Sequence, residues 1–128
     1  MGNTIFYILL AIIVVWFVYK QFVPVKGVKS LNGKEFEEAL KQSAKDAQLI
    51  DVREDNEFRQ GRIVGAKNIS VGQIGQKLDQ IAKDKPVFVY CRSGMRSKQA
   101  AKILSRNGYS QIFNLNGGIM AWSGQVVK

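Results

Sequence analysis

An unbroken apolar run near the start of the chain is the first feature of the hydrophobic pattern. Residues 4–19 read TIFYILLAIIVVWFVY, contain no charged residue and are followed by Lys20. As a helix this run spans roughly 24 Å, slightly less than a hydrocarbon core of ~30 Å. Lys20 and Gln21 can snorkel to the membrane surface and make up the difference. The pattern therefore predicts a transmembrane helix over about residues 4–23.

Three other interpretations of this run are a cleaved signal peptide, a buried core helix and a helix lying in the membrane interface. A signal peptide has a basic first segment and a small-residue cleavage site, and neither residues 1–3 nor residues 19–22 supply them. The other two kinds of helix carry a polar face, whereas this run is apolar all round. We therefore expect an uncleaved membrane anchor.

The composition changes after the apolar run, which indicates a boundary between an anchor and a second unit. Residues 22–27 form a short connector in which Pro24 stops the helix and Gly27 loosens the chain. We therefore predict an anchor with its connector over residues 1–27 and one domain over residues 28–128.

Short apolar strands alternate with amphipathic segments throughout residues 28–128. The expected elements are a helix capped by Asn32 and running to about Ser43, a strand over 48–52, a helix through Ile74, Leu78 and Ile81, a strand over 87–90, a helix over about 95–106, a strand over 112–115 and a turn over 116–118. This alternation is typical of a parallel sheet covered by helices on both faces. The predicted fold class is α/β, a three-layer domain with a mostly parallel central sheet flanked by helices, preceded by one transmembrane helix.

The net charge of +9 at pH 7 could indicate nucleic acid, an anionic membrane or an acidic substrate as the partner. Lys20, Lys26, Lys29 and Lys34 all follow the apolar run, and no charged side chain precedes it. The positive-inside rule then predicts a single-pass membrane protein whose C-terminal domain faces the cytoplasm, with the lipid bilayer as a partner. The basic residues form no nucleic-acid motif, so no nucleic acid is expected.

The chain contains one cysteine and no histidine. This composition excludes an internal disulfide, a zinc cluster of the Cys/His kind, and any catalytic pair that needs histidine. We therefore expect no metal and no organic cofactor. A nucleophile in this chain must be activated by backbone amides and arginine alone.

The single cysteine, Cys91, lies between the apolar strand 87–90 and a helix, in the sequence VFVYCRSGMRS. At such a junction the free amides of the loop and the positive end of the helix dipole can surround an anion. The expected anion-binding loop consists of Arg92, Ser93, Gly94, Met95, Arg96 and Ser97. Within it, glycine allows a tight turn, the serine hydroxyls donate inward, and Arg96 presents a bidentate fork to the anion.

The same field lowers the pKa of the Cys91 thiol, so that much of it is thiolate at neutral pH. A small buried hydrophobe at the end of a core strand is the alternative role for a lone cysteine. The two arginines, the glycine and the two serines that follow favour a reactive thiolate. Arg92 has no assigned role beyond the loop backbone and would also suit a solvated charge.

Three ordered stretches of this chain resemble the rhodanese homology domain in its single-domain form. They are CRSGMRS at residues 91–97, LIDVRE at 49–54 with the residues that follow to Ile69, and LNGGIMAW at 115–122. The resemblance covers about residues 28–128 and implies a rhodanese-like fold. It implies that Cys91 carries sulfur, that residues 92–96 form the cradle, and that the side chain of Arg96 faces the anion.

The remaining residues of these stretches suit structural roles better than catalytic ones. We interpret them as a strand end, an ion pair, turn glycines and packing residues: Asp51, Arg53, Glu57, Gly61, Gly65, Gly117, Gly118 and Trp122.

The activity implied by the resemblance is sulfur transfer. A persulfide on Cys91 would carry sulfane sulfur from a small donor, thiosulfate or another persulfide, to a thiol acceptor or cyanide, and a protein thiol could also accept it. A cysteine phosphatase is disfavoured, because the four residues between Cys91 and Arg96 make a shorter loop than phosphatases use. The alternative function is a membrane-tethered protein-binding or redox-sensing module without turnover.

Overall fold

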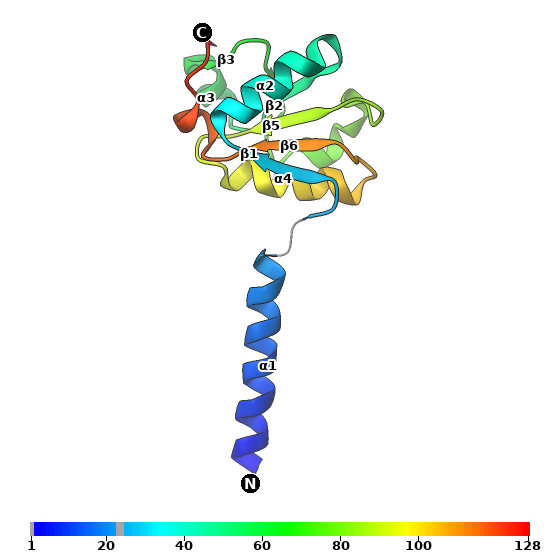
Figure 1. The fold of residues 1–128 in the computed structure, drawn as a ribbon, viewed down its shortest axis with the longest axis vertical. Coiled ribbons are helices and arrows are strands. Elements are labelled where there is room, and N and C mark those ends of the chain that lie inside the picture. The colour runs from blue at the N-terminus through cyan, green and yellow to red at the C-terminus, as the bar shows by residue number, and fades with distance from the viewer. Residues whose placement is uncertain (1, 23–24) are drawn as a thin grey trace.

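The computed structural model describes residues 2–22 and 25–128, and shows a long helix followed by an α/β domain (Figure 1). Helix α1 covers Gly2–Phe22, and residues 2–20 are long and apolar enough to cross a membrane. A signal sequence near an N-terminus would meet the same criteria. Val23 and Pro24, where the helix was expected to end, lie outside the described residues.

The centre of the domain is a sheet of five parallel strands in the order β1-β6-β5-β2-β4. The strands are β1 (Val28–Leu31), β2 (Gln48–Asp51), β4 (Lys67–Asn68), β5 (Val87–Tyr90) and β6 (Ile112–Leu115). Strand β5 lies in the middle, and all four of its residues are buried. This arrangement confirms the predicted parallel sheet and three of its strands.

Helices cover both faces of the sheet, as the alternation of elements predicts. Helix α2 (Gly33–Ser43) lies on one face and helix α4 (Met95–Arg106) on the other (Figure 1). Phe36 of α2 packs with Phe88 and Tyr90, whereas Ala100 and Leu104 of α4 pack with Val87 and Val89. Successive residues of β5 thus serve two separate cores, which is why this strand reads as a continuous apolar run.

Helix α2 begins where its sequence predicts. The Asn32 side chain accepts a hydrogen bond from the Glu35 amide at 2.9 Å, and the Glu35 carboxylate accepts one from the Asn32 amide at 3.1 Å. This reciprocal capping box satisfies two amides that the first helical turn leaves free.

The segment around Ile74–Ile81 differs from the prediction of a second amphipathic helix. It forms two short 3₁₀ turns, η2 (Ile74–Gln76) and η3 (Leu78–Gln80). Ile74 and Ile81 are buried as their spacing predicts, but Gly75 disfavours an α-helix. The Tyr109 hydroxyl lies 2.9 and 2.6 Å from the carbonyls of Leu78 and Ile81, so its single hydrogen is shared between two acceptors at the end of this segment.

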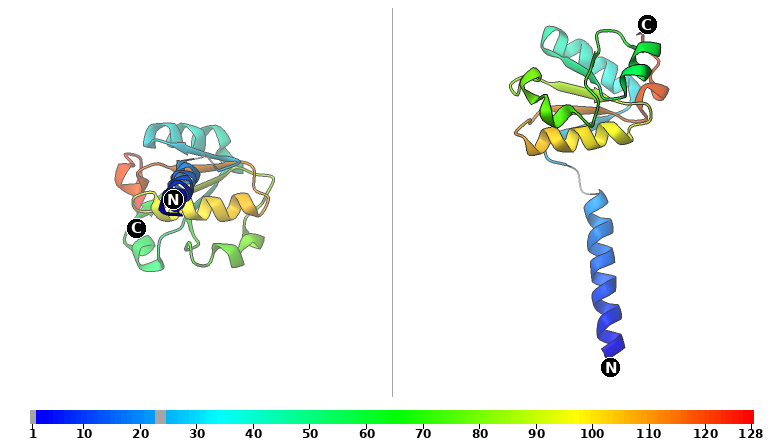
Figure 2. Two further views of the ribbon diagram at one scale, coloured as in Figure 1. Left: turned by 90° about the horizontal axis from the view of Figure 1, so that it is seen from below. Right: turned by 180° about the vertical axis from the view of Figure 1, so that it is seen from behind.

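Among the smaller elements, η1 (Ala44–Asp46) leads into the amino end of β2. The others follow the carboxyl ends of the strands, and they are α3 (Asp55–Gln60), β3 (Arg62–Ile63), η4 (Gly118–Ala121) and β7 (Val126–Val127). Strands β3 and β7 pair antiparallel and tie the end of the chain to the segment after α3. The C-terminus lies on the far side of the domain from α1 (Figure 2).

Candidate active site

Cys91 directly follows β5 at the carboxyl edge of the sheet, and a tight loop leads from it into α4. Gly94 is the N-cap of α4 and has a φ of 103°, a conformation that side chains other than glycine rarely adopt. Cys91 itself is only 1% exposed, whereas Arg92, Ser93 and Met95 are exposed. The thiol therefore lies at the base of the loop, and the side chains of Arg92, Ser93 and Met95 lie on its rim.

The backbone of the loop points donors at the sulfur atom. Sγ of Cys91 accepts hydrogen bonds from the Gly94 amide at 3.0 Å and from the Ser97 amide at 3.4 Å. The Ser97 hydroxyl lies 3.4 Å from Sγ and donates to the Gly94 carbonyl at 3.1 Å. A hydroxyl can rotate, so on ionisation of the thiol it can turn its hydrogen toward the sulfur.

These donors decide the charge state of the thiol. Burial of Cys91 acts to raise its pKa. The Ser97 hydroxyl and the backbone amides of the loop oppose burial and outweigh it, so the pKa lies below its ordinary value. The site can therefore present a thiolate without a histidine.

The turn over residues 116–118 lies directly against this loop. Gly117 and Gly118 both have positive φ, 79° and 63°. The Ile119 amide donates to the Cys91 carbonyl at 2.9 Å, and the Met120 amide donates to the Arg92 carbonyl at 3.3 Å. The two glycines are turn residues as predicted, but they also brace the backbone of Cys91 and Arg92, which the sequence interpretation did not include.

Arg96 was expected to present its bidentate fork to a bound anion, whereas in the structure the fork is paired with Glu57. The guanidinium donates to the two carboxylate oxygens at 2.7 and 3.0 Å. The hydrogen bond from Arg96 lowers the pKa of Glu57 to about 2. Glu57 was assigned to the scaffold, and its pairing across to α4 was not foreseen.

The sequence predicts an ion pair in this region without naming its partners, and in the structure it joins Asp51 and Arg53. Arg53 donates to the Asp51 carboxylate at 2.7 Å, and both side chains are almost fully buried. The same guanidinium donates to the Gly61 carbonyl at 2.6 Å, while the Asn68 side chain donates to the carbonyls of Asp51 and Arg53. This network fixes the carboxyl end of β2 beside the Cys91 loop.

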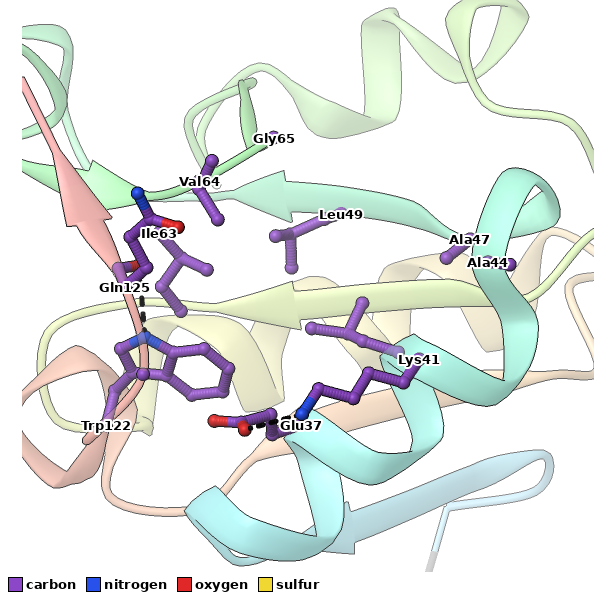
Figure 3. Close-up of a pocket in the computed structure, with 12 residues that line it drawn as sticks. Glu37, Lys41, Ala44, Ala47, Leu49, Ile63, Val64, Gly65, Trp122 and Gln125 are labelled. Atoms are coloured by element: carbon purple, nitrogen blue, oxygen red, sulfur yellow. Dashed lines mark hydrogen bonds and ion pairs between the residues drawn. The ribbon is translucent and has the colours of Figure 1, made fainter.

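A separate cavity of about 470 Å³ lies on the α2 side of the sheet (Figure 3). Trp122, Leu49 and Ile63 line it, and the Glu37–Lys41 ion pair lies at its edge. No residue of the Cys91 loop lines this cavity. Trp122 also packs edge to face against Phe36, with ring centroids 6.1 Å apart, which is the packing role that the sequence predicts.

Within residues 2–22 and 25–128, no group of three or more His, Cys, Asp or Glu side chains is placed to hold a metal ion. The chemistry available at Cys91 in the described structure consists of the thiol, the amides that face it, the Ser97 hydroxyl and the nearby guanidinium of Arg96.

The reactivity of Cys91 should report its lowered pKa. The rate of alkylation by iodoacetamide should rise with pH along a curve whose midpoint lies below the ~8.5 of a free thiol, because the thiolate persists to lower pH. Removing the Ser97 hydroxyl in Ser97→Ala should move this midpoint upward. Ser105→Ala, at the other end of α4, is the matched control and should leave it unchanged; a wild-type midpoint at the free-thiol value would contradict the prediction.

Comparison with known proteins supports the fold and identifies the family. Residues 34–125 match a family model described as Rhodanese-like domain. The uncharacterized protein YqhL of Bacillus subtilis (strain 168) is 39% identical over 126 residues, which are 98% of this chain and 97% of that protein. The thiosulfate sulfurtransferase GlpE of Shewanella oneidensis is 35% identical over 79 residues, 62% of this chain and 78% of that protein.

A solved structure shares the architecture. The Rhodanese-like domain protein from Staphylococcus aureus superimposes with a TM-score of 0.68 at 32% identity, covering 76% of this chain and 93% of that one.

Proposed function

Because the chain belongs to the rhodanese-like domain family, we propose that it is a sulfurtransferase, held in a membrane by α1, that carries sulfane sulfur on Cys91. The observation that supports this most directly is the pair of amide hydrogen bonds to Sγ from Gly94 and Ser97. A relative named as a thiosulfate sulfurtransferase supports the same activity. Thiosulfate or a persulfide is the proposed donor, and a thiol or cyanide the proposed acceptor.

The first step is attack of the Cys91 thiolate on the sulfane sulfur of the donor. A sulfur–sulfur bond forms to Cys91 while the sulfur–sulfur bond of the donor breaks, and the electron pair of that bond leaves with the departing group. With thiosulfate the departing group is sulfite. The product is a Cys91 persulfide whose terminal sulfur is negatively charged.

The second step regenerates the enzyme. A thiolate acceptor attacks the terminal sulfur of the Cys91 persulfide, forms its own persulfide and releases the Cys91 thiolate. Cyanide as acceptor takes the same sulfur as thiocyanate. In each step one bond to the transferred sulfur forms while one sulfur–sulfur bond breaks, so neither step requires an external oxidant or reductant.

The inward amides of the Cys91 loop serve both steps. In the structure they donate to Sγ, and in the persulfide they are positioned to stabilise a second, more distant sulfur anion at the positive end of α4. Arg96 stands at the first turn of α4, and its fork is held by Glu57. We propose that this guanidinium supplies positive charge to the departing anion from its paired position.

The low exposure of Cys91 supports a second candidate function. A thiol that is 1% exposed reacts with a donor only when rim side chains of the loop move aside. A module that binds a protein partner at a membrane, without turnover, would need no access to this thiol. Sulfur loading separates these two functions.

The proposed orientation rests on the basic residues in the last turn of α1 and after it. Lys20, Lys26, Lys29 and Lys34 lie on the domain side of the helix, and we propose that they keep the domain on the cytoplasmic side of the membrane. Lys20 also lies over the Trp16 ring, 4.7 Å from its centroid. Such a Trp–Lys pair suits the level of the lipid headgroups.

Intact mass spectrometry tests the proposed function. The full chain in detergent, treated with thiosulfate and freed of excess reagent, should gain the mass of one sulfur atom. A thiol acceptor should then remove it, because the second step restores the thiolate. An unchanged mass after donor treatment, with Cys91 still open to alkylation, would support the binding module instead.

A further inference from the structure

We propose that the exposed face of α4 docks on the anionic lipid surface of the membrane, which brings the Cys91 loop to the lipid headgroups. This inference rests on the proposed anchoring by α1 and adds a second contact between the protein and the bilayer. The docking face consists of Met95, Lys98, Gln99, Lys102 and Arg106, all of which are exposed.

The spacing of these residues places them along one side of the helix. Steps of three and four residues recur along a single helical face, and the opposite face of α4 carries the buried residues Ala100, Ala101 and Leu104. Met95 is 76% exposed at the loop end of this face. The three cations that follow it would each be attracted to an anionic lipid surface.

The charge of this face has no partner within the described part of the domain. Lys98, Lys102 and Arg106 take part in none of the salt bridges among residues 2–22 and 25–128. The first turn of α4 contains Arg96 but no acidic residue, and Lys98 follows it. Cations near a helix N-terminus oppose the helix dipole, so Lys98 does not serve the stability of the helix.

The opposite helix has a different charge balance. Helix α2 carries three glutamates and two lysines, Lys34, Glu35, Glu37, Glu38 and Lys41, whereas α4 contains only basic charged residues. An anionic surface would therefore attract the α4 side of the domain and turn the α2 side away from it. This asymmetry gives the domain a preferred orientation.

The connection to α1 lies on the same side. The Lys26 carbonyl accepts a hydrogen bond from the Ser105 hydroxyl of α4 at 2.6 Å, and the Gly27 carbonyl accepts one from the Ile112 amide at 2.9 Å. From Phe22 to Val25 the chain spans at most about 11 Å. In both side views α4 lies on the side of the domain that faces α1 (Figures 1 and 2).

Because the connection between α1 and the domain is short, a weak attraction between α4 and the lipid surface is sufficient for docking. A domain tethered so close to a surface meets it at a high effective concentration, so docking needs no strong affinity of its own. Three cations beside an anionic surface shift the ratio of docked to undocked domain by about 100-fold. Because α4 is about 18 Å long, docking along it places the Cys91 loop at the same surface as its C-terminal end.

Spin labels on the two helices test this proposal with the full chain in lipid nanodiscs. In a Cys91→Ser background, Gln99→Cys places a label on the docking face and Gln42→Cys places a matched label on the exposed part of α2. With phosphatidylglycerol in the nanodisc, a water-soluble nickel reagent should reach the Gln99 label several-fold less than in pure phosphatidylcholine. The Gln42 label should show no difference. High salt should remove the protection by screening.

Charge variants complete the test. The triple variant Lys98→Glu, Lys102→Glu, Arg106→Glu should lower the docked-to-undocked ratio by at least about 100-fold, and the milder glutamine triple variant should lower it less. Lys45→Glu, Lys67→Glu and Lys128→Glu, an equal charge change at exposed positions elsewhere on the domain, should preserve docking. Equal label accessibility in both lipids would overturn the proposal, as would protection that appears only when native membrane proteins are present.

The outcomes for docking and for the proposed function can be told apart. Extraction of the chain from membranes by alkaline carbonate would show that the anchor fails. Retention of the chain in the membrane without lipid-dependent protection of the Gln99 label would show that docking alone fails. Sulfur loading of Cys91 in detergent requires neither, and the glutamate triple variant should load sulfur as the wild type does.

Discussion

Cys91→Ser should reduce turnover of thiosulfate to background, a loss of at least about 1,000-fold, because serine supplies no thiolate to carry sulfur. The substitution replaces the only thiol of the chain, and the buried position should accept a hydroxyl of similar size. Release of sulfite from thiosulfate in the presence of cyanide measures the effect. The free energy of unfolding, measured in parallel, shows that the variant is folded.

A relocated thiol provides the matched control for this prediction. The double variant Cys91→Ser, Gln99→Cys still contains a single cysteine. That cysteine now lies on α4, at an exposed position away from the amides that face Sγ of Cys91. It should remain inactive, because the thiol at position 99 lacks the donors that Gly94 and Ser97 supply to Sγ. Turnover by this double variant would show that any accessible thiol suffices, and the role given to the loop would be wrong.

Gly118→Ala should unfold the domain more readily and impair the Cys91 loop at the same time. A Cβ at position 118 would overlap the Arg92 carbonyl group and come within 2.6 Å of the Cys91 carbonyl oxygen. These are backbone atoms and cannot rotate away. A backbone clash of this kind lowers the free energy of unfolding by roughly 3 kcal/mol or more. To relieve it, the backbone of Cys91 and Arg92 would have to move.

Gly65→Ala is the control for Gly118→Ala, because it tests the effect of a positive φ without a steric clash. Gly65 also has a positive φ, 86°, but a Cβ there would meet no atom within 4 Å. Gly65→Ala should therefore lower the free energy of unfolding by only about 1 kcal/mol and leave sulfur transfer intact. Urea denaturation and thiosulfate turnover compare the two variants. Equal stability losses, or normal turnover by Gly118→Ala, would show that the turn does not brace the loop.

The elements that sequence could predict are those with a long or unambiguous apolar pattern. Strand β5 and helix α4 have the bounds that the pattern predicts, because each buries a continuous or regularly spaced set of side chains. The segment over residues 74–81 has the spacing of a helix as well. There, contacts with the distant Tyr109 hydroxyl and the presence of Gly75 override the periodicity.

The shortest strands left no pattern to find. Strands β3, β4 and β7 contain two residues each, which is too few to show alternation. Their positions depend on pairing with segments far along the chain, as Arg62 does with Val127. Only the folded backbone brings such segments together.

The candidate site likewise combines features that neighbouring residues predict with contacts between residues far apart in the sequence. The Cys91 loop is contiguous, so its amides, its glycine and its position before a helix could be predicted from neighbouring residues. The partner of Arg96 lies 39 residues away in α3, and the support for the loop comes from Gly117 and Gly118 on another strand end. Neither relationship has a local signal in the sequence.

The outer strands of the sheet also affect whether two copies of the chain associate edge to edge. Strand β1 has four residues and β4 has two, and their outward lysines, Lys29 and Lys67, are exposed. Open strand edges can recruit another chain and start aggregation, a hazard that short length and lysine reduce. For copies held in one bilayer by α1, as proposed above, collisions in two dimensions would be frequent, and these short edges with exposed lysines would oppose pairing of one sheet with another.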